Sequence, residues 1–459
     1  MLLLTYYEVN LSNSPAFDGE PVVAVNPTNP NNVVVAWIKG MFGTSFIAVR
    51  SSYDGGITWS SVRIMPHVVG GFRSADPTMA FSEDGTLYLV YVDYSLDSGF
   101  VVLTVSTDGG STWYSPRVII RYDEAPDFPI DRPWLTVSGN NLYITTMEAK
   151  IAGATPPYYL YLKYSHDGGL TWSPLIPIGD STNFPSQVRS MGQIALWGDS
   201  IIYIGYFSYN PSHYPLPRHM LAISTDGGFT FRYKEISALL PRSIVADTLL
   251  KIGSPLIVIP ANGKIIATRI DGTFGDPDAV AQVSGDGGDT WTTPFRLNDD
   301  TPVNGVYQDM LWGCAKDSVV AFFWRDRRNG GMGRAVPFEI YGTISFDGGN
   351  TFGRNFVVSG QPSEYDTILT SSGNDFLSCA LGDTAIYVAW GDLRDTSSHL
   401  DIYVAVMPIR KLGIKSKRYG KVYKDGAIYD VLGRRRSGAR SSGVYFIVNE
   451  NKAKKVIVK

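Results

Sequence analysis

Cysteine and histidine are scarce in this chain of 459 residues, which has two Cys and five His. No two of them have the spacing of a zinc site, and the histidines are scattered over His67, His166, His213, His219 and His399. We therefore expect no resident cofactor, with calcium as the one cation kept open. Cys314 and Cys379 fall in segments that we expect to be innermost strands, where buried free thiols are favoured over a disulfide.

Long apolar runs are absent too, so no membrane-spanning helix of about 18 residues or more is expected. Helical periodicity is also missing, and only 18% of the residues are charged. The 47 Gly, 27 Pro and 27 Tyr instead suit the turns and the large core of an all-β protein. Met1 to Thr5 lacks the basic start and the full apolar stretch of a signal peptide. Three explanations stay open, namely a mature chain, a truncated reading frame or a protein that stays inside the cell.

The most informative feature present is an octapeptide, Ser-x-Asp-Gly-Gly-x-Thr-(Trp/Phe), that occurs six times. Its Asp residues are 54, 59, 59, 60 and 61 positions apart, at Asp54, Asp108, Asp167, Asp226, Asp286 and Asp347. Such even spacing indicates an array of similar modules. In the second copy the octapeptide lies between two apolar runs, 101–105 and 116–120, which predicts a strand, a turn and a strand.

We expect these six Asp residues to be structural rather than catalytic. A carboxylate can accept hydrogen bonds from turn amides, and the two glycines permit positive φ. The octapeptides resemble the Asp-boxes, or BNR repeats, of sialidases and other secreted carbohydrate-active or glycan-binding β-propellers. This resemblance implies that each box joins the third and fourth strands of a blade, on the face opposite the usual ligand site.

The number of blades follows from a second repeated unit, made of an innermost strand, a turn and an apolar strand. Seven copies can be found, at 20–37, 76–92, 132–147, 191–206, 247–269, 309–324 and 375–390. The seventh copy continues into a strand at 401–406 but has no octapeptide after it, and residues 4–11 are available to pair there and close the ring. We therefore predict a seven-bladed propeller, with six blades as the alternative.

The last fifty residues differ in charge from the rest. Residues 410–459 contain 15 Lys and Arg against 3 Asp and Glu, and residues 1–409 contain 25 against 40. We therefore predict a propeller domain over 1–409 and a small basic β segment over 410–459. The stretches 428–434, 443–448 and 455–459 resemble the C-terminal sorting domain of type IX secretion substrates, which implies a secreted or cell-surface protein. A nucleic-acid-binding arm is the disfavoured alternative, because apolar alternation indicates folded strands.

Candidate site residues come from aligning the seven units. One column, where each innermost strand begins, reads Glu20, Asp76, Arg132, Met191, Asp309 and Asp375. Its acids make Asp76, Asp309 and Asp375 the candidates for a catalytic acid and base, with Arg132 as the one cation. A Trp-x-Asp-x-Arg pattern adds Asp326, Arg328, Asp392 and Arg394 as ligand-binding candidates. The alternative for this pattern is an Asp-Arg pair that only fixes its own loop.

Sialidase chemistry sets a stricter test. It requires an arginine cluster, a Tyr activated by a Glu and an Asp acid/base. Glu364-Tyr365 offers a conceivable pair, so Tyr365 is a further candidate, but the Arg-Ile-Pro motif of those enzymes is missing near the N-terminus. Two hypotheses remain, a secreted glycoside hydrolase and a non-catalytic propeller that binds a glycan or a protein. For either one we expect a monomer with a glycan or glycoprotein ligand and no nucleic-acid partner.

Overall fold

The computed structural model describes most of the chain as strands joined by turns. The described residues are 7–125, 128–147, 160–179, 193–208, 218–238, 256–365, 374, 377–395 and 399–409, with four strands between 428 and 458. The chain divides into two compact units, residues 5–407 and residues 408–459 together with 1–4. Throughout the described ranges we find no helix that is long and apolar enough to cross a membrane.

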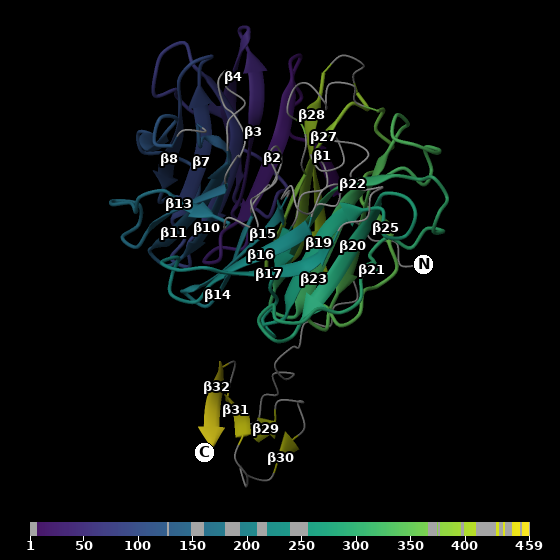
Figure 1. Ribbon diagram of the computed structural model, residues 1–459. Coiled ribbons are helices and arrows are strands. Elements are labelled where there is room, and N and C mark those ends of the chain that lie inside the picture. Colours follow the sequence, from purple (N-terminus) through teal and green to yellow (C-terminus); the bar gives the residue numbers. More distant parts are fainter. Residues whose placement is uncertain are drawn as a thin grey trace. The chain divides into compact units, whose positions relative to one another are not determined.

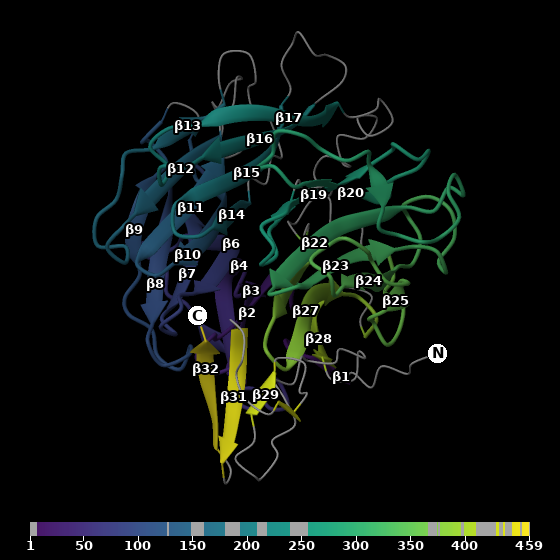
Figure 2. The same cartoon turned by 90° about the horizontal axis from the view of Figure 1, so that it is seen from below.

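The larger unit is a β-propeller of seven four-stranded antiparallel blades, as predicted, which follow one another in chain order (Figures 1 and 2). Blades 1 to 3 consist of β2 (Asp18–Val25), β3 (Val33–Met41), β4 (Thr44–Ser52) and β5 (Arg63–Ile64); β6 (Arg73–Phe81), β7 (Leu87–Tyr94), β8 (Gly99–Ser106) and β9 (Arg117–Arg121); and β10 (Asp131–Ser138), β11 (Asn141–Met147), β12 (Leu160–Ser165) and β13 (Ile176–Ile178).

Blades 4 to 6 repeat the same arrangement. They consist of β14 (Ile194–Trp197), β15 (Ile201–Ser208), β16 (Arg218–Ser224) and β17 (Arg232–Ala238); β18 (Leu256–Val258), β19 (Ile265–Asp271), β20 (Asp278–Ser284) and β21 (Phe295–Arg296); and β22 (Gln308–Lys316), β23 (Val319–Asp326), β24 (Glu339–Ser345) and β25 (Phe356–Val357).

Blade 7 combines the two ends of the propeller unit. Its strands β26 (Ser378–Leu381), β27 (Ala385–Asp392) and β28 (Asp401–Pro408) are completed by the N-terminal strand β1 (Tyr7–Asn10). Tyr7 pairs with Val406 and Asn10 with Tyr403, so the predicted ring closure is confirmed. The six-bladed alternative is wrong, because the seventh unit forms a full four-stranded blade.

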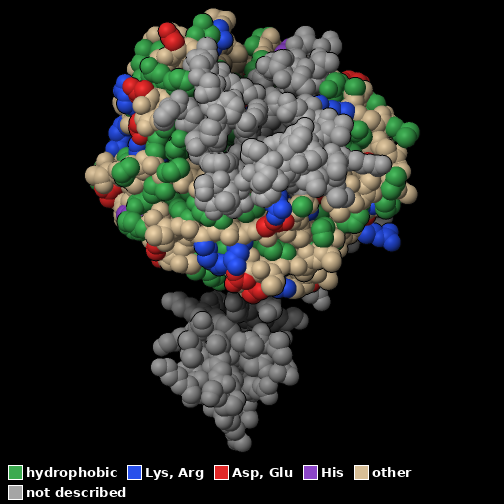
Figure 3. All heavy atoms as spheres, viewed as in Figure 1, with side chains coloured by type: hydrophobic (Ala, Val, Ile, Leu, Met, Phe, Trp, Pro, Cys, Tyr) green, Lys and Arg blue, Asp and Glu red, His purple; other side chains and the backbone are tan. Residues whose placement is uncertain are grey.

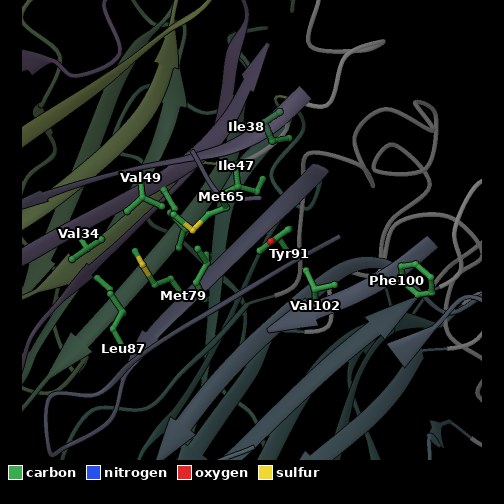
Figure 4. Close-up of a cluster of buried hydrophobic side chains, with 14 residues drawn as sticks. Val34, Ile38, Ile47, Val49, Met65, Met79, Leu87, Tyr91, Phe100 and Val102 are labelled. Carbon is green, nitrogen blue, oxygen red and sulfur yellow. The ribbon is translucent and has the colours of Figure 1, made fainter. Parts of the chain in front are cut away.

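Apolar side chains fill the space between neighbouring blades. Between blades 1 and 2, Val34 and Ile47 pack with Met79, Leu87 and Tyr91 (Figure 4). Each fully buried Val, Leu or Ile stabilises the fold by about 1.5–3 kcal/mol relative to an exposed one. A similar cluster joins blade 1 to blade 7, and it completes the ring.

The six octapeptides form one type of turn, which we call the Asp-Gly-Gly turn. The Asp Oδ1 atom accepts a hydrogen bond from the Thr backbone N at 2.8–3.0 Å, and Oδ2 accepts one from the Thr hydroxyl at 2.5–2.7 Å. Hydrogen bonds from Thr58 lower the pKa of Asp54 to about 2. Both carboxylate oxygens of every Asp are thus hydrogen-bonded within its own turn.

The second glycine of each turn lies against the preceding blade. In blade 2, Gly110 has a φ of +89°, and a Cβ atom there would lie 2.5 Å from Ser51 Oγ in blade 1. Gly56 meets Val406 of blade 7 in the same way, so the turns also fit the ring together. Glycine is therefore required for both its conformation and the close approach.

The smaller unit contains one antiparallel sheet, with the strand order β30-β29-β31-β32. The strands are β29 (Ile428–Asp430), β30 (Arg435–Arg436), β31 (Gly443–Asn449) and β32 (Lys452–Val458). β31 and β32 form a hairpin in which Gly443 pairs with Val458. The apolar alternation in this part of the sequence thus corresponds to strands.

Candidate functional site

The innermost strands of blades 1, 2, 3 and 6 begin with a β-bulge. The residues with positive φ in these four bulges are Glu20 (52°), Asp76 (52°), Arg132 (47°) and Met310 (52°). In blades 1 to 3 the next residue is proline, which normally holds the preceding residue in an extended conformation. A strained backbone of this kind costs about 1–3 kcal/mol per residue and is concentrated at functional sites.

The bulge corrects the column of residues aligned from the sequence. The positive-φ position in blade 6 belongs to Met310, and Asp309 lies one residue before it, opposite Arg325. A shift of one residue reverses the direction of a strand side chain. Asp309 therefore does not occupy the position that Glu20, Asp76 and Arg132 share. Met191 and Asp375 from the same column lie outside the described residues.

Asp309 is buried and held by two arginines. Its carboxylate accepts hydrogen bonds from Arg325 Nε at 2.5 Å, Arg325 Nη2 at 2.6 Å and Arg327 Nη2 at 2.9 Å, and it is 1% exposed. Burial alone would raise the pKa of Asp309, but the two guanidiniums outweigh it and hold the pKa below its usual range. A carboxylate with these partners serves to anchor a loop, and the geometry does not favour the acid/base role expected for it.

The two Trp-x-Asp-x-Arg stretches have the same geometry. Trp324 Nε1 donates to Asp326 at 2.8 Å, and Arg328 Nη2 donates to the same carboxylate at 2.8 Å. In blade 7, Trp390 and Arg394 bind Asp392 in this way, and Arg394 also forms an ion pair with Glu8 at 2.8 Å. Each arginine thus pairs with the Asp of its own stretch, as in the alternative of a loop-fixing pair, but Arg328 also donates to Asp299 at 2.8 Å.

Charged residues lie where the inner strands of blades 1 to 3 begin, and Tyr94, the last residue of β7, is near enough to feel the charges of four of them. Burial raises the pKa of Tyr94, and the nearby carboxylates of Asp76, Asp131 and Glu20 raise it further, whereas Arg73 opposes them. Arg132 belongs to the cluster because its backbone N donates to Asp76 Oδ2 at 3.1 Å. We call these six residues the mouth cluster: Glu20, Arg73, Asp76, Tyr94, Asp131 and Arg132.

The pairing of the strands gives the cluster its place in the blade. In blade 2, Arg73 pairs with Tyr94 at one end of the sheet, and Leu87 pairs with Ser106 at the other end, next to the Asp-Gly-Gly turn. The mouth cluster and the turns are therefore at opposite ends of the blade. Tyr94 and Asp131 were missed from the sequence, although Asp131 is adjacent to Arg132 of the aligned column.

His67 is a further residue that the sequence pattern did not single out. Its Nδ1 atom lies 2.7 Å from Asp93 Oδ1, and Ser74 Oγ is within 3.0 Å of the same nitrogen. Asp93 also accepts a hydrogen bond from Val68 N at 2.8 Å. The loop before β6 is thereby fixed beside the mouth cluster.

The remaining candidates are only partly described. Tyr365 is half-buried and Glu364 is exposed, and the structure gives no hydrogen bond between their side chains. Among the described residues, no group of three or more His, Cys, Asp or Glu side chains is arranged to hold a metal ion.

No family model matches the chain, and no curated protein matches it in sequence. Solved structures with a similar fold include a protein of unknown function from Dyadobacter fermentans, at 17% identity and a TM-score of 0.48, with 88% of this chain and 99% of that one covered. A Hadza microbial sialidase matches at 14% identity and a TM-score of 0.46, with 82% of this chain and 77% of that one covered. An α-L-arabinanase from Penicillium chrysogenum matches at 12% identity and a TM-score of 0.46, with 88% of this chain and 97% of that one covered. Identities this low do not transfer a ligand or a reaction to this chain.

Proposed function

We propose that the protein binds a neutral glycan at the mouth cluster, over blades 1 to 3 of the propeller. The observation that carries this proposal is the repeated strain, since three consecutive inner strands hold a charged residue at positive φ directly before proline. A single strained residue has little meaning, but three at equivalent positions of neighbouring blades are best explained by a common task. That task is to direct Glu20, Asp76 and Arg132 to one place.

The charge of the cluster favours a neutral ligand. Glu20, Asp76 and Asp131 provide three acids against Arg73 and Arg132, so one negative charge remains. An excess of acids repels a free anionic sugar, whereas sugar hydroxyls can donate to carboxylates and accept from guanidiniums. Tyr94 adds an aromatic ring, against which a sugar can pack. Turnover of sialosides is therefore expected to be close to zero.

Hydrolysis at the same mouth is the second candidate, because two of its carboxyl groups have different surroundings. Glu20 is 1% exposed, whereas Asp76 is half-buried. Two carboxyl groups in different environments are the usual basis for dividing the roles of acid and base. The arginine-bound carboxylates Asp309, Asp326 and Asp392 are less suited to these roles.

The test is a binding titration of the full chain with a panel of neutral oligosaccharides, with sialyllactose as the anionic comparison. Asp76→Asn and Tyr94→Phe are expected to weaken neutral-glycan binding about tenfold or more, which corresponds to about 1.4 kcal/mol. The matched control is Asp108→Asn, at the other end of blade 2, which should leave the affinity unchanged. Unchanged binding by Asp76→Asn, or strong sialoside hydrolysis that Tyr365→Phe abolishes, contradicts the proposal.

Release of product from the same glycans distinguishes the two candidates. Hydrolysis that is lost in Asp76→Asn supports an enzyme, and binding without product supports a glycan-binding protein. We also propose that residues 410–459 direct secretion, because the stretches 428–434, 443–448 and 455–459 resemble a type IX sorting domain. A reporter protein fused to these residues should be exported by a cell with type IX machinery, and the same reporter without them should be retained.

A further inference from the structure

Two grooves lie between neighbouring blades, at their outer strands and away from the mouth cluster. The groove between blades 1 and 2 has a volume of about 520 Å³, and Tyr53, Arg63 and Ser111 are among its lining residues. The groove between blades 2 and 3 has a volume of about 360 Å³, and Tyr114 and Arg117 are among its lining residues. We call them the rim grooves.

The two rim grooves are equivalent parts of successive blades. Arg63 pairs with Val49, three residues before Ser52 of the first Asp-Gly-Gly turn. Arg117 pairs with Leu103, three residues before Ser106 of the second turn. Each arginine thus occupies the same place on an outer strand, beside the turn of the next blade.

Blade 4 shows what such a cation does when the protein supplies an acid. Lys234 pairs with Leu221, which is three residues before Ser224, so it corresponds to Arg63 and Arg117. Its Nζ atom lies 2.8 Å from Asp289 in the Asp-Gly-Gly turn of blade 5, and Arg232 lies 2.9 Å from the same carboxylate. At this place an acid from the next turn neutralises the cations.

The rim grooves lack this acid. Asp289 is the third residue after Asp286, and the corresponding residues in the next turns are Ser111 for Arg63 and Leu170 for Arg117. Within the described part of the chain, neither Arg63 nor Arg117 forms an ion pair, and both are exposed. An exposed tyrosine stands at each groove, Tyr53 at 48% and Tyr114 at 65% exposure.

We propose that the rim grooves bind an acidic polysaccharide, whose carboxylate or sulfate groups take the place that Asp289 has beside Lys234. A guanidinium binds such groups through two parallel hydrogen bonds, and a tyrosine ring offers a face on which a sugar ring packs. The two grooves are one blade apart, so a polymer with repeated charges can occupy both and gain avidity. This site is separate from the mouth cluster and does not depend on its function.

The experiment measures the affinity of the full chain for polygalacturonate, heparin and neutral dextran at 0.15 M salt. Binding of either acidic polymer without binding of dextran is expected, and the polymer that binds identifies carboxylate or sulfate as the group recognised. Arg63→Gln with Arg117→Gln should weaken this binding about tenfold or more. The matched control is Lys234→Gln, which removes a cation that is already neutralised and should change the affinity by less than about twofold.

A second variant keeps both arginines and supplies the missing acid. Ser111→Asp with Leu170→Asp reproduces the arrangement of Asp289 and should abolish polymer binding while the protein stays folded. Asp76→Asn should bind the acidic polymer normally, which separates this proposal from that for the mouth. Equal binding by the wild type and the double arginine variant overturns the proposal. Tighter binding of polyglutamate than of either polysaccharide overturns it too, because the ligand would then be an acidic peptide.

Discussion

The indole rings of Trp134 and Trp312 lie 5.1 Å apart, although β10 and β22 belong to blades 3 and 6. Both residues come from innermost strands and are less than a tenth exposed, so the two rings meet across the axis of the propeller. The channel is therefore filled by side chains at this level. A ligand at the mouth cluster meets a closed floor rather than an open tunnel.

Loss of one indole should destabilise the whole ring. Trp134→Ala is expected to lower the free energy of unfolding by about 3–5 kcal/mol, because it removes a large buried side chain and leaves a cavity. Chemical denaturation monitored by circular dichroism measures this loss. Trp134→Phe should recover part of it, and a loss below about 1 kcal/mol would show that the two rings do not support the fold.

The Asp-Gly-Gly turns allow a second test of stability. Asp108→Ala removes the acceptor for Thr112 N and Thr112 Oγ1, so it should lower the unfolding free energy by about 1–2 kcal/mol. Asp108→Asn keeps one acceptor oxygen and should cost less. Glycan binding by the folded fraction should be the same for both variants. A loss of binding at unchanged stability would assign the turn to the ligand site.

These turns also show how far the sequence could predict the structure. Turn chemistry is local, because Asp, Gly, Gly and Thr lie within a few residues, and so the six octapeptides indicated the hairpins. The number of blades came instead from the seven strand units, because the seventh blade has no octapeptide. The bulge before Met310 is not local, since it depends on pairing between β22 and β23. Without that pairing, Asp309 was aligned with Asp76, and the convergence of Glu20, Asp131 and Tyr94 from three blades was not visible.

The cysteines lead to a prediction about oxidation. Cys314 and Cys379 are free thiols on neighbouring inner strands, with their sulfur atoms 2.9 Å apart, and a disulfide needs about 2.05 Å. Glutathione disulfide should therefore oxidise the pair, with two protons and two electrons passing to form two glutathione thiols. After this treatment, titration of free thiols in the denatured protein should detect none, compared with two before it. In Cys379→Ser the single remaining thiol should form no intramolecular bond, and two persistent thiols in the wild type would contradict the prediction.

Asp278 should make stability depend on pH. Burial raises its pKa to about 6, although hydrogen bonds from Asn298 and Arg296 oppose this effect. The folded state therefore holds the proton more tightly than the unfolded state, whose carboxyl has an ordinary pKa near 4. The contribution of the Asp278 carboxyl to the free energy of unfolding is complete below pH 4 and is lost as the pH rises through 6.

Asp278→Asn provides the comparison, because the amide is neutral at every pH. The unfolding free energy of this variant relative to the wild type should increase from pH 5 to pH 7. Denaturant titrations at several pH values measure the difference. Arg296 and Asn298 can still donate to the amide oxygen, so the fold should be retained. A difference that stays constant over this range would mean that Asp278 is ionised throughout.

Asp76 and Asp309 looked alike in the sequence, and their substitution should now give opposite results. Asp309→Asn leaves Arg325 and Arg327 buried without their charge partner, so the unfolding free energy should fall by about 3–5 kcal/mol. Asp76→Asn changes a half-buried residue and should alter stability by less than about 1 kcal/mol while neutral-glycan binding weakens about tenfold or more. Unfolding and binding are both measured for each variant. If Asp309→Asn stays as stable as the wild type and loses only binding, then the carboxylate of blade 6 belongs to the ligand site and the assignment of the mouth cluster to blades 1 to 3 fails.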